Sequence, residues 1–227
     1  MAEENSRTEV LDTEDEAAAA ARSRGAPEEI TEEALEARRQ ALAQIVKYGD
    51  PVLRSEASTV TEFDEELVEE LARMVQIMRD AMGVGLAATQ LGILRRALVF
   101  QAGPDAPATA LLNPVVEWTS EEEETAEEGC LSIPGVVVDV ERPLHARVKA
   151  QGPNGEAIEI EASGLEARVL QHEIDHLNGI LMLQHAPRDQ RRAALRALRE
   201  GESYAPPRED DEDDGGDEPA DVSAAEA

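Results

Sequence analysis

Two histidines four residues apart are the strongest chemical signal in this chain. Residues 171–176 read Gln-His-Glu-Ile-Asp-His, and positions four apart on a helix share one face. His172 and His176 can therefore direct two imidazoles at one metal ion, with Glu173 beside them as a base. The pattern is typical of a hydrolytic metal centre, but two imidazoles leave its coordination incomplete.

The single cysteine offers a third ligand. Cys130 can form no internal disulfide, so in isolation it indicates either a small buried hydrophobic residue or a thiol with a chemical use. It lies about forty residues before the histidine pair, in Glu128-Gly129-Cys130-Leu131-Ser132. One thiolate and two imidazoles leave a tetrahedral site with one open position, which suits water activation by zinc or ferrous iron. This chemistry favours the thiolate.

Local patterns predict the elements that hold these residues. Ser163 with Glu166 fits a capping box that would start the helix of the histidine pair, and Gly179 would end it. Asp64 can cap an earlier helix that ends at Gly83. The apolar stripe of that earlier helix is Leu67, Leu71, Met74 and Met78.

Two further helices and several strands complete the pattern. Pro187 would open a final helix that runs to about Glu200, and the stretch from Ile30 to Ala43 is compatible with a transient helix. The strand-like segments are Ala97–Phe100, Leu111–Trp118, Val136–Val140, Ala146–Ala150 and Ile158–Ile160. Pro153-Asn154-Gly155 makes the last two a plausible hairpin. Helices and strands without regular βαβ alternation predict an α+β fold.

The chain is strongly acidic, with a formal net charge of -29 over 227 residues. Acidity of this size argues against broad nucleic-acid binding, so DNA is not an expected partner. Residues 1–40 carry a net charge of -7 and residues 202–227 one of -10, and both are poor in large apolar side chains. Such compositions predict disorder. We expect acidic extensions at 1–43 and 201–227 and one folded domain at 44–200.

The N-terminus does not resemble a signal peptide. It is acidic where a basic patch and an apolar core would be needed, and no apolar run approaches the length of a membrane span. We therefore expect a cytoplasmic protein without a membrane partner.

Three motifs, in this order, resemble the signature blocks of the peptide deformylase family. They are Gly83-Val84-Gly85-Leu86-Ala87-Ala88-Thr89-Gln90, Glu128-Gly129-Cys130-Leu131-Ser132 and Gln171-His172-Glu173-Ile174-Asp175-His176. The resemblance spans roughly Ile45 to Arg199 and leaves the acidic extensions unexplained. It implies that 44–200 is a catalytic domain that removes formyl from the N-terminal methionine of nascent polypeptides. It also implies strands, in antiparallel or mixed sheets, around the metal-binding helix.

The resemblance assigns roles to individual residues. It implies Cys130, His172 and His176 as ligands of one divalent metal, and Glu173 as the catalytic carboxylate. Ferrous iron is the metal that the family suggests, and ligand softness equally allows zinc. Gln90 through its side-chain amide and Leu131 through its backbone N–H would form the oxyanion site.

The same resemblance implies contacts around the substrate and the metal. Val84 and Gly85 would pair with the substrate backbone, while Leu165, Val169 and Val84 are core residues by default and candidates for the methionine pocket. Metal-bound imidazoles need a partner on the other ring nitrogen. The residues expected to orient the ligands are Glu128, Gln171 and Asp175, in pairings that the sequence leaves open. No direct role is expected of His145 or His185.

The last predicted helix, 187–200, suggests a partner besides the formyl-methionyl chain. One face carries an arginine row that could bind RNA phosphates of the ribosome, and the plain alternative is a solvated amphipathic helix. The row consists of Arg188, Arg192, Arg196 and Arg199.

Two other functional classes share part of this pattern. A metalloprotease also carries His-Glu-x-x-His, but takes its third ligand from a downstream Glu or His, whereas Cys130 lies upstream. A catalytically silent binding protein would be expected to lack a ligand or the base, and none of them is missing here.

Overall fold

The computed structural model describes residues 31–103 and 105–207. The chain divides into two units, 1–36 and 37–227. Of the first unit, the structure describes only residues 31–36, which include the start of helix α2 (Glu32–Gln44). The stretch predicted as a transient helix is therefore an α-helix. The disorder expected of the tails falls mainly on 1–30 and 208–227, which lie outside the described residues.

The second unit contains the remaining helices and strands. In chain order they are η1 (Pro51–Arg54), α3 (Glu65–Asp80), β1 (Gly85–Ala87), η2 (Ala88–Leu91), β2 (Ala97–Phe100), β3 (Thr109–Thr119), β4 (Glu123–Cys130), β5 (Ile133–Pro143), β6 (His145–Gln151), β7 (Ala157–Ser163), α4 (Leu165–Leu177), η3 (Met182–Gln184) and α5 (Arg188–Glu200).

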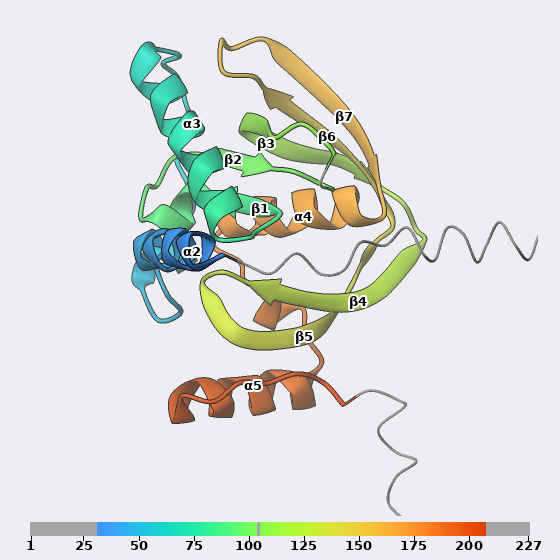
Figure 1. Cartoon of the computed structure of the whole chain (residues 1–227). Helices are drawn as coiled ribbons and strands as arrows, with labels where there is room; N and C mark the ends of the chain where they lie inside the picture. The colour runs from blue at the N-terminus through green and yellow to red at the C-terminus, as the bar shows by residue number, and fades with distance from the viewer. Residues whose placement is uncertain (1–30, 104, 208–227) are drawn as a thin grey trace, which may run out of the picture. The chain divides into compact units, whose positions relative to one another are not determined.

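Two antiparallel sheets enclose helix α4 (Figure 1). One sheet has five strands in the order β1-β2-β3-β6-β7, and the other consists of the hairpin β4–β5. Helix α4 lies between the two sheets, and α5 covers the outer side of β5 (Figure 1). The predicted α+β fold with a central helix and a C-terminal helix is confirmed.

All five predicted strands are present as β2, β3, β5, β6 and β7. The hairpin at Pro153-Asn154-Gly155 is also confirmed, because β6 pairs antiparallel with β7 and Gly155 has φ +81°. Strands β1 and β4 were not predicted. Strand β4 reads Glu-Glu-Thr-Ala-Glu-Glu-Gly-Cys, which has little intrinsic strand propensity, so its pairing with β5 decides its conformation.

The two predicted helix starts have different outcomes. The Asp64 cap is confirmed, since its side chain accepts a hydrogen bond from Leu67 N–H at 2.9 Å. The capping box at Ser163 is wrong. Ser163 ends β7, Gly164 is the N-cap of α4 without a side-chain cap, and the Ser163 hydroxyl contacts His145 Nδ1 at 2.8 Å. Ser163 therefore pairs in the sheet instead of capping the helix, because tertiary context overrides the local preference.

The prediction of where each helix ends is confirmed for α4 and wrong for α3. Gly179 follows the last turn of α4 with φ +71°, as predicted. Helix α3, however, ends at Asp80 rather than at Gly83, and the left-handed residue is Met82 with φ +60°. Gly83 N–H then bonds to Met78 O at 2.9 Å, which closes the helix.

Buried apolar residues connect α3 and α4 to the five-stranded sheet. The predicted stripe of α3 is buried and packs against β1 and β2. Val169, Leu170, Ile174 and Leu177 of α4 pack against the five-stranded sheet. This burial holds the helix of the histidine pair firmly against that sheet. Among the described residues, no helix is long and apolar enough to cross a membrane.

Candidate metal centre

The three predicted ligands converge at one point between the hairpin and α4. Cys130 ends β4, and His172 and His176 lie one turn apart on α4. One potential ligand atom from each residue lies within 4.8 Å of the other two. Cys130 Sγ is 3.2 Å from His176 Nε2, and the two imidazole centroids are 5.0 Å apart. The helical spacing and the hairpin together bring a sulfur and two nitrogens into reach of one ion.

An irregularity in the hairpin positions the thiol. The register of β4 and β5 shifts between Gly129, which faces Val137, and Cys130, which faces Ile133. Such irregularities interrupt the ladder and redirect a side chain, and they are frequent near active sites. Cys130 is therefore aimed by the strand pairing and not by its own sequence neighbourhood.

The electrostatics of the triad favour a charged thiol. Burial raises the pKa of Cys130, but the charge of His176 and the hydrogen bonds of both histidines outweigh it and hold this pKa well below its usual value. Burial lowers the pKa of His172, but its hydrogen bonds to Cys130 and Glu128 raise it well above the usual value. A deprotonated sulfur is the form that binds metal.

Glu128 orients one of the candidate ligands. Its Oε2 contacts His172 Nδ1 at 2.9 Å, which leaves Nε2 of that ring for a metal. Arg142 forms two hydrogen bonds with the same carboxylate, at 2.6 and 3.0 Å, and Arg168 adds a third at 2.9 Å. Burial raises the pKa of Glu128, but the hydrogen bonds and charges of His172 and Arg142 outweigh it and lower the pKa to about 2. Glu128 is thus a fixed negative charge behind His172.

The other two residues expected to orient ligands have different partners. Asp175 Oδ2 accepts from Arg142 at 2.8 Å and contacts His185 Nε2 at 3.0 Å, so it reaches the ligands only through Arg142 and Glu128. The Gln171 side-chain amide donates to the carbonyls of Pro143 and Ala167, both at 3.0 Å. In the part of the chain that the structure describes, His176 Nδ1 is buried without a hydrogen-bond partner.

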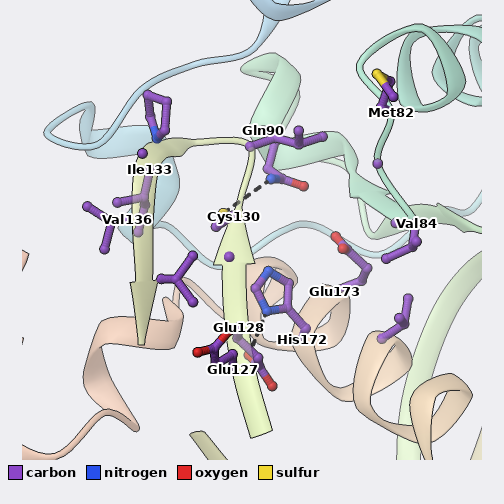
Figure 2. Close-up of a pocket in the computed structure, with 18 of the residues that line it drawn as sticks. Met82, Val84, Gln90, Glu127, Glu128, Cys130, Ile133, Val136, His172 and Glu173 are labelled. Atoms are coloured by element: carbon purple, nitrogen blue, oxygen red, sulfur yellow. Dashed lines mark hydrogen bonds and ion pairs between the residues drawn. The ribbon is translucent and has the colours of Figure 1, made fainter. Parts of the chain in front are cut away.

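Glu173 has the surroundings of a proton carrier. It is buried, and its Oε2 has no hydrogen-bond partner among residues 31–103 and 105–207. A Cβ atom at Gly85 would lie 2.3 Å from Glu173 Oε1, so only glycine leaves room for this carboxylate. Burial raises the pKa of Glu173. The side chain lies between His172 and Val84 (Figure 2).

The two predicted oxyanion residues lie next to the triad. Gln90 Nε2 is 3.7 Å from Cys130 Sγ, and its Oε1 accepts from Ala87 N–H at 2.8 Å, which fixes the orientation of the amide. Leu131 follows Cys130 in the turn between β4 and β5. Lys47 Nζ donates to the Leu131 carbonyl at 3.2 Å and so holds this turn.

A cavity of about 650 Å³ opens at this centre. Gln90, Cys130, His172 and Glu173 line it, together with the predicted substrate residues. Val84 and Leu165 are 47% and 56% exposed, whereas Val169 is buried. Of the three residues expected in the core, Val169 is therefore buried, whereas Val84 and Leu165 are exposed where they line the cavity.

Sequence reasoning did not identify the cations that support the site. Arg142, Arg168 and Lys47 contact Glu128 or the Leu131 turn. The two arginines are buried, although nothing in their sequence surroundings distinguishes them from surface arginines. A buried arginine becomes recognisable only when its carboxylate partners are placed beside it.

The donor set fits a divalent metal. A thiolate and two imidazole nitrogens are suitable ligands for zinc or ferrous iron, and three protein ligands leave a position for a reacting molecule. Within the described ranges, this is the group of three ligand residues close enough to hold an ion. The third ligand lies upstream of the histidines, unlike that of the protease class.

Comparison with known proteins agrees with this geometry. The family model described as polypeptide deformylase matches residues 42–192. The chain belongs to the polypeptide deformylase family. As a deformylase, it is a hydrolase that removes the formyl group from the N-terminus of nascent polypeptides and uses one divalent metal.

Individual relatives are similar over most of their length. The peptide deformylase of a Parafrankia species is 44% identical over 154 residues, which are 68% of this chain and 84% of that protein. A crystal structure of the Synechococcus elongatus deformylase in complex with actinonin is 40% identical, with a TM-score of 0.65, and the match covers 70% of this chain and 88% of that one. The Thermotoga maritima deformylase structure is 45% identical, with a TM-score of 0.61 over 63% and 96% of the two chains. The matched part of this chain therefore has the deformylase fold.

Proposed function

We propose that Cys130, His172 and His176 hold the metal of this deformylase and that Glu173 is its catalytic carboxylate. The observation that carries the proposal is the convergence of three donor atoms within 4.8 Å beside a buried carboxylate oxygen without a hydrogen-bond partner among the described residues. When bound there, a divalent ion would supply Lewis-acid activation of a water molecule.

Glu173 would move the proton that deformylation requires. Water adds to the formyl carbon, the C–N bond breaks, and the products are formate and a free N-terminal amine. Glu173 would accept a proton from the attacking water and deliver it to the leaving nitrogen. A carboxyl group whose pKa is raised by burial suits both steps better than one with an ordinary pKa.

The remaining site residues would position the substrate. Gln90 Nε2 and the Leu131 N–H would donate to the oxygen that gains charge as water adds. Val84 and Gly85 would pair with the substrate backbone. The residues that would line the methionine pocket are Leu165 and Val169, both at the cavity wall.

Activity of the metal-loaded protein tests these roles. Anaerobically purified protein is expected to release formate from a formyl-methionyl peptide. Glu173→Ala should lose at least about a hundredfold in kcat, the usual scale for a general base, while it keeps its metal. A metal-loaded Glu173→Ala protein that released formate at the wild-type rate would contradict the assigned role.

Ferrous iron is the metal we propose in the cell, with zinc as the alternative. The mixed sulfur and nitrogen ligand set is compatible with both ions. A thiolate-bound ferrous ion would make the enzyme sensitive to oxidation at Cys130. We expect metal analysis of anaerobically purified protein to find iron, and exposure to air to reduce activity. Full activity with zinc in air and no gain with iron would favour zinc.

Helix α5 is our proposed contact with the ribosome. Its arginine row is exposed, and three of its members surround one shallow depression together with Asp189 and Glu200. Clustered arginines bind RNA phosphates in a salt-dependent manner. The members are Arg188, Arg192, Arg196 and Arg199, of which the last three line the depression. The acidic residues after 201 would compete for the same side chains.

A ribosome pelleting assay tests this contact. Reversal of all four charges in the row should abolish co-sedimentation at low salt, whereas Arg73→Glu on α3 should not. If the four-fold variant pelleted like the wild type, α5 would not be the contact.

The domain boundaries and the cellular location remain proposals. We place the catalytic domain at 44–200, supported by the family match to 42–192, with acidic extensions at 1–43 and 201–227. Residues 37–43 and 202–205 of these extensions pack with the domain. Because nascent chains are its substrates, we propose that the enzyme works in the cytoplasm.

A further inference from the structure

The cavity at the candidate metal centre extends beyond the part of the chain that the family model matches. That match covers residues 42–192. Arg38 on α2 precedes it, and Ser203, Tyr204 and Ala205 follow it, yet all four residues line the cavity that also contains His172. Part of the cavity wall therefore comes from segments outside the matched family region.

Backbone hydrogen bonds fix the C-terminal part of this wall. Tyr204 N–H donates to Gly135 O at 2.8 Å, and Val137 N–H donates to Tyr204 O at 2.8 Å. Tyr204 thereby forms a parallel bridge with Val136 on the free edge of β5. At its start, Glu202 N–H bonds to Ala197 O of α5 at 2.9 Å. The segment 202–205 is thus an ordered extension of the hairpin sheet.

The same segment packs closely on the start of β5. Gly135 has φ +73°, and a Cβ atom there would lie 2.9 Å from Ser203 Oγ. The turn at Leu131 and Ser132 and the first residues of β5 join this position to Cys130, the candidate ligand. The cavity therefore follows the hairpin turn from the candidate metal centre to the C-terminal segment.

The cavity is larger than one methionine residue requires. Its volume of about 650 Å³ lies in the middle of the range of sites for drug-sized ligands, roughly 300–1,000 Å³. Val84 and Glu173 lie on one side of Cys130, and Ile133 and Val136 of β5 lie on the other side (Figure 2). A formyl-methionyl group beside Glu173 would leave the β5 side free for further residues of an extended chain, at about 3.3 Å each.

We infer that Ser203–Ala205 and Arg38 form an extended subsite that contacts the residues after methionine in the formylated chain. The occupant is the substrate polypeptide, because this wall is continuous with the candidate reaction site and the segment lies on the edge of β5. The inference rests on the proposed function. It makes the C-terminal segment a specificity element for substrate length.

A peptide-length series tests the inference. Formate release is measured with the metal-loaded full chain on formyl-Met-Ala and on formyl-Met-Ala-Ala-Ala. The full chain should show a kcat/KM about tenfold higher for the longer peptide, a gain expected from added contacts. A chain that ends after Glu202 should lose most of this gain, whereas a chain that ends after Pro207 should keep it.

Point variants separate substrate contact from folding. Ala205→Trp keeps the backbone pairing of the segment but fills the space beside it in the cavity. Arg38→Ala removes the positive charge from the cavity wall. Each should reduce kcat/KM at least about fivefold more for the longer peptide than for the shorter one. The matched controls are Glu202→Trp in the same segment and Arg39→Ala on the same helix, which do not line the cavity and should preserve the ratio.

Each other outcome overturns the inference. An equal loss on both peptides would mean that the segment only supports the fold. An unchanged length dependence after truncation at Glu202 would mean that the segment does not touch the substrate. Formate release from neither peptide by the metal-loaded full chain would instead contradict the proposed function itself.

Discussion

Glu128 connects the candidate ligand His172 to two buried arginines. Its side chain is 5% exposed and accepts hydrogen bonds from Arg142 and Arg168 while it contacts His172 Nδ1. Buried charges of this kind are tolerated only when each is paired and hydrogen-bonded. Removing Glu128 would leave two guanidinium groups without their carboxylate, so the residue matters for stability as well as for the metal site.

The depressed pKa of Glu128 predicts acid sensitivity of the metal-free protein. The folded-state pKa of about 2 lies below the ordinary value of 4.5, so the contribution to stability is present above pH 4.5 and is lost as pH falls toward 2. The contribution is on the order of 3 kcal/mol. Urea denaturation of wild type and Glu128→Gln should show a stability difference that narrows by about 2 kcal/mol between pH 7 and pH 3, because pH 3 still lies above the folded-state pKa. A difference independent of pH would contradict the assignment.

Gln90 should act through its side-chain donor. Gln90→Ala is expected to lower kcat about a hundredfold or more, the usual loss of one oxyanion donor, with metal content unchanged. Gln90→Glu keeps the acceptor for Ala87 N–H but lacks the amide donor, so it should be impaired to a similar degree. Formate-release kinetics with metal analysis measure both. Near-normal activity of Gln90→Glu would show that the donor is not used.

At the scale of elements, the hairpin β4–β5 places Cys130 opposite α4. Strand β5 buries Val136, Val138 and Val140 at alternate positions, which is the period of a strand with one apolar face. Strand β4 lacks such a pattern and depends on β5 for its register. The position of the thiol is therefore a property of the pair of strands.

The turn that ends α4 should be sensitive to side-chain size. Gly179 and Gly201 both have φ near +70°, at +71° and +74°. A Cβ at Gly179 would lie 2.7 Å from the Arg54 carbonyl group, whereas Gly201 has nothing within 4 Å. Gly201→Ala should cost about 1 kcal/mol from backbone strain alone. Gly179→Ala should cost about 2–4 kcal/mol because overpacking is added.

Urea denaturation of the two glycine variants gives the comparison directly. The difference between them isolates the contact of Gly179 with η1, because the backbone conformations are nearly the same. Equal losses of unfolding free energy would show that η1 moves away without cost.

At the scale of the whole molecule, the metal would join two parts of the fold. One candidate ligand comes from the β4–β5 hairpin and two from α4, which packs on the five-stranded sheet. A ligand that binds only the folded state stabilises it by mass action, by about 4 kcal/mol at a thousandfold excess over Kd. Metal removal should therefore loosen the hairpin from the helix.

Chelation should lower the thermal stability of the protein. We expect the Tm to fall by about 8–16 °C on metal removal, from that free energy and the usual sensitivity of a chain of this length. Differential scanning calorimetry before chelation, after chelation and after metal return measures the change. Cys130→Ser should show a smaller response. An unchanged Tm after verified metal loss would contradict the bridging role.

The sequence by itself determined the chemistry. The spacing of His172 and His176 on a helix, the single Cys130 and the three ordered motifs led to a metal-dependent deformylase. Apolar alternation located five strands, and the α+β class followed. The spacing and the alternation are local features, so they can be read from residue type and period alone. The deformylase assignment came from the resemblance of the three motifs to the family.

Only the tertiary structure decided how the site is supported. The polar segment 123–130 becomes strand β4 only through its pairing with β5, and the register shift of this pair directs Cys130. Arg142 and Arg168 meet Glu128 only in the folded chain. The tertiary structure also placed Ser203–Ala205 at the cavity that contains Glu173. Contacts of this kind join residues distant in sequence, and their energies depend on burial and partners that no local pattern carries.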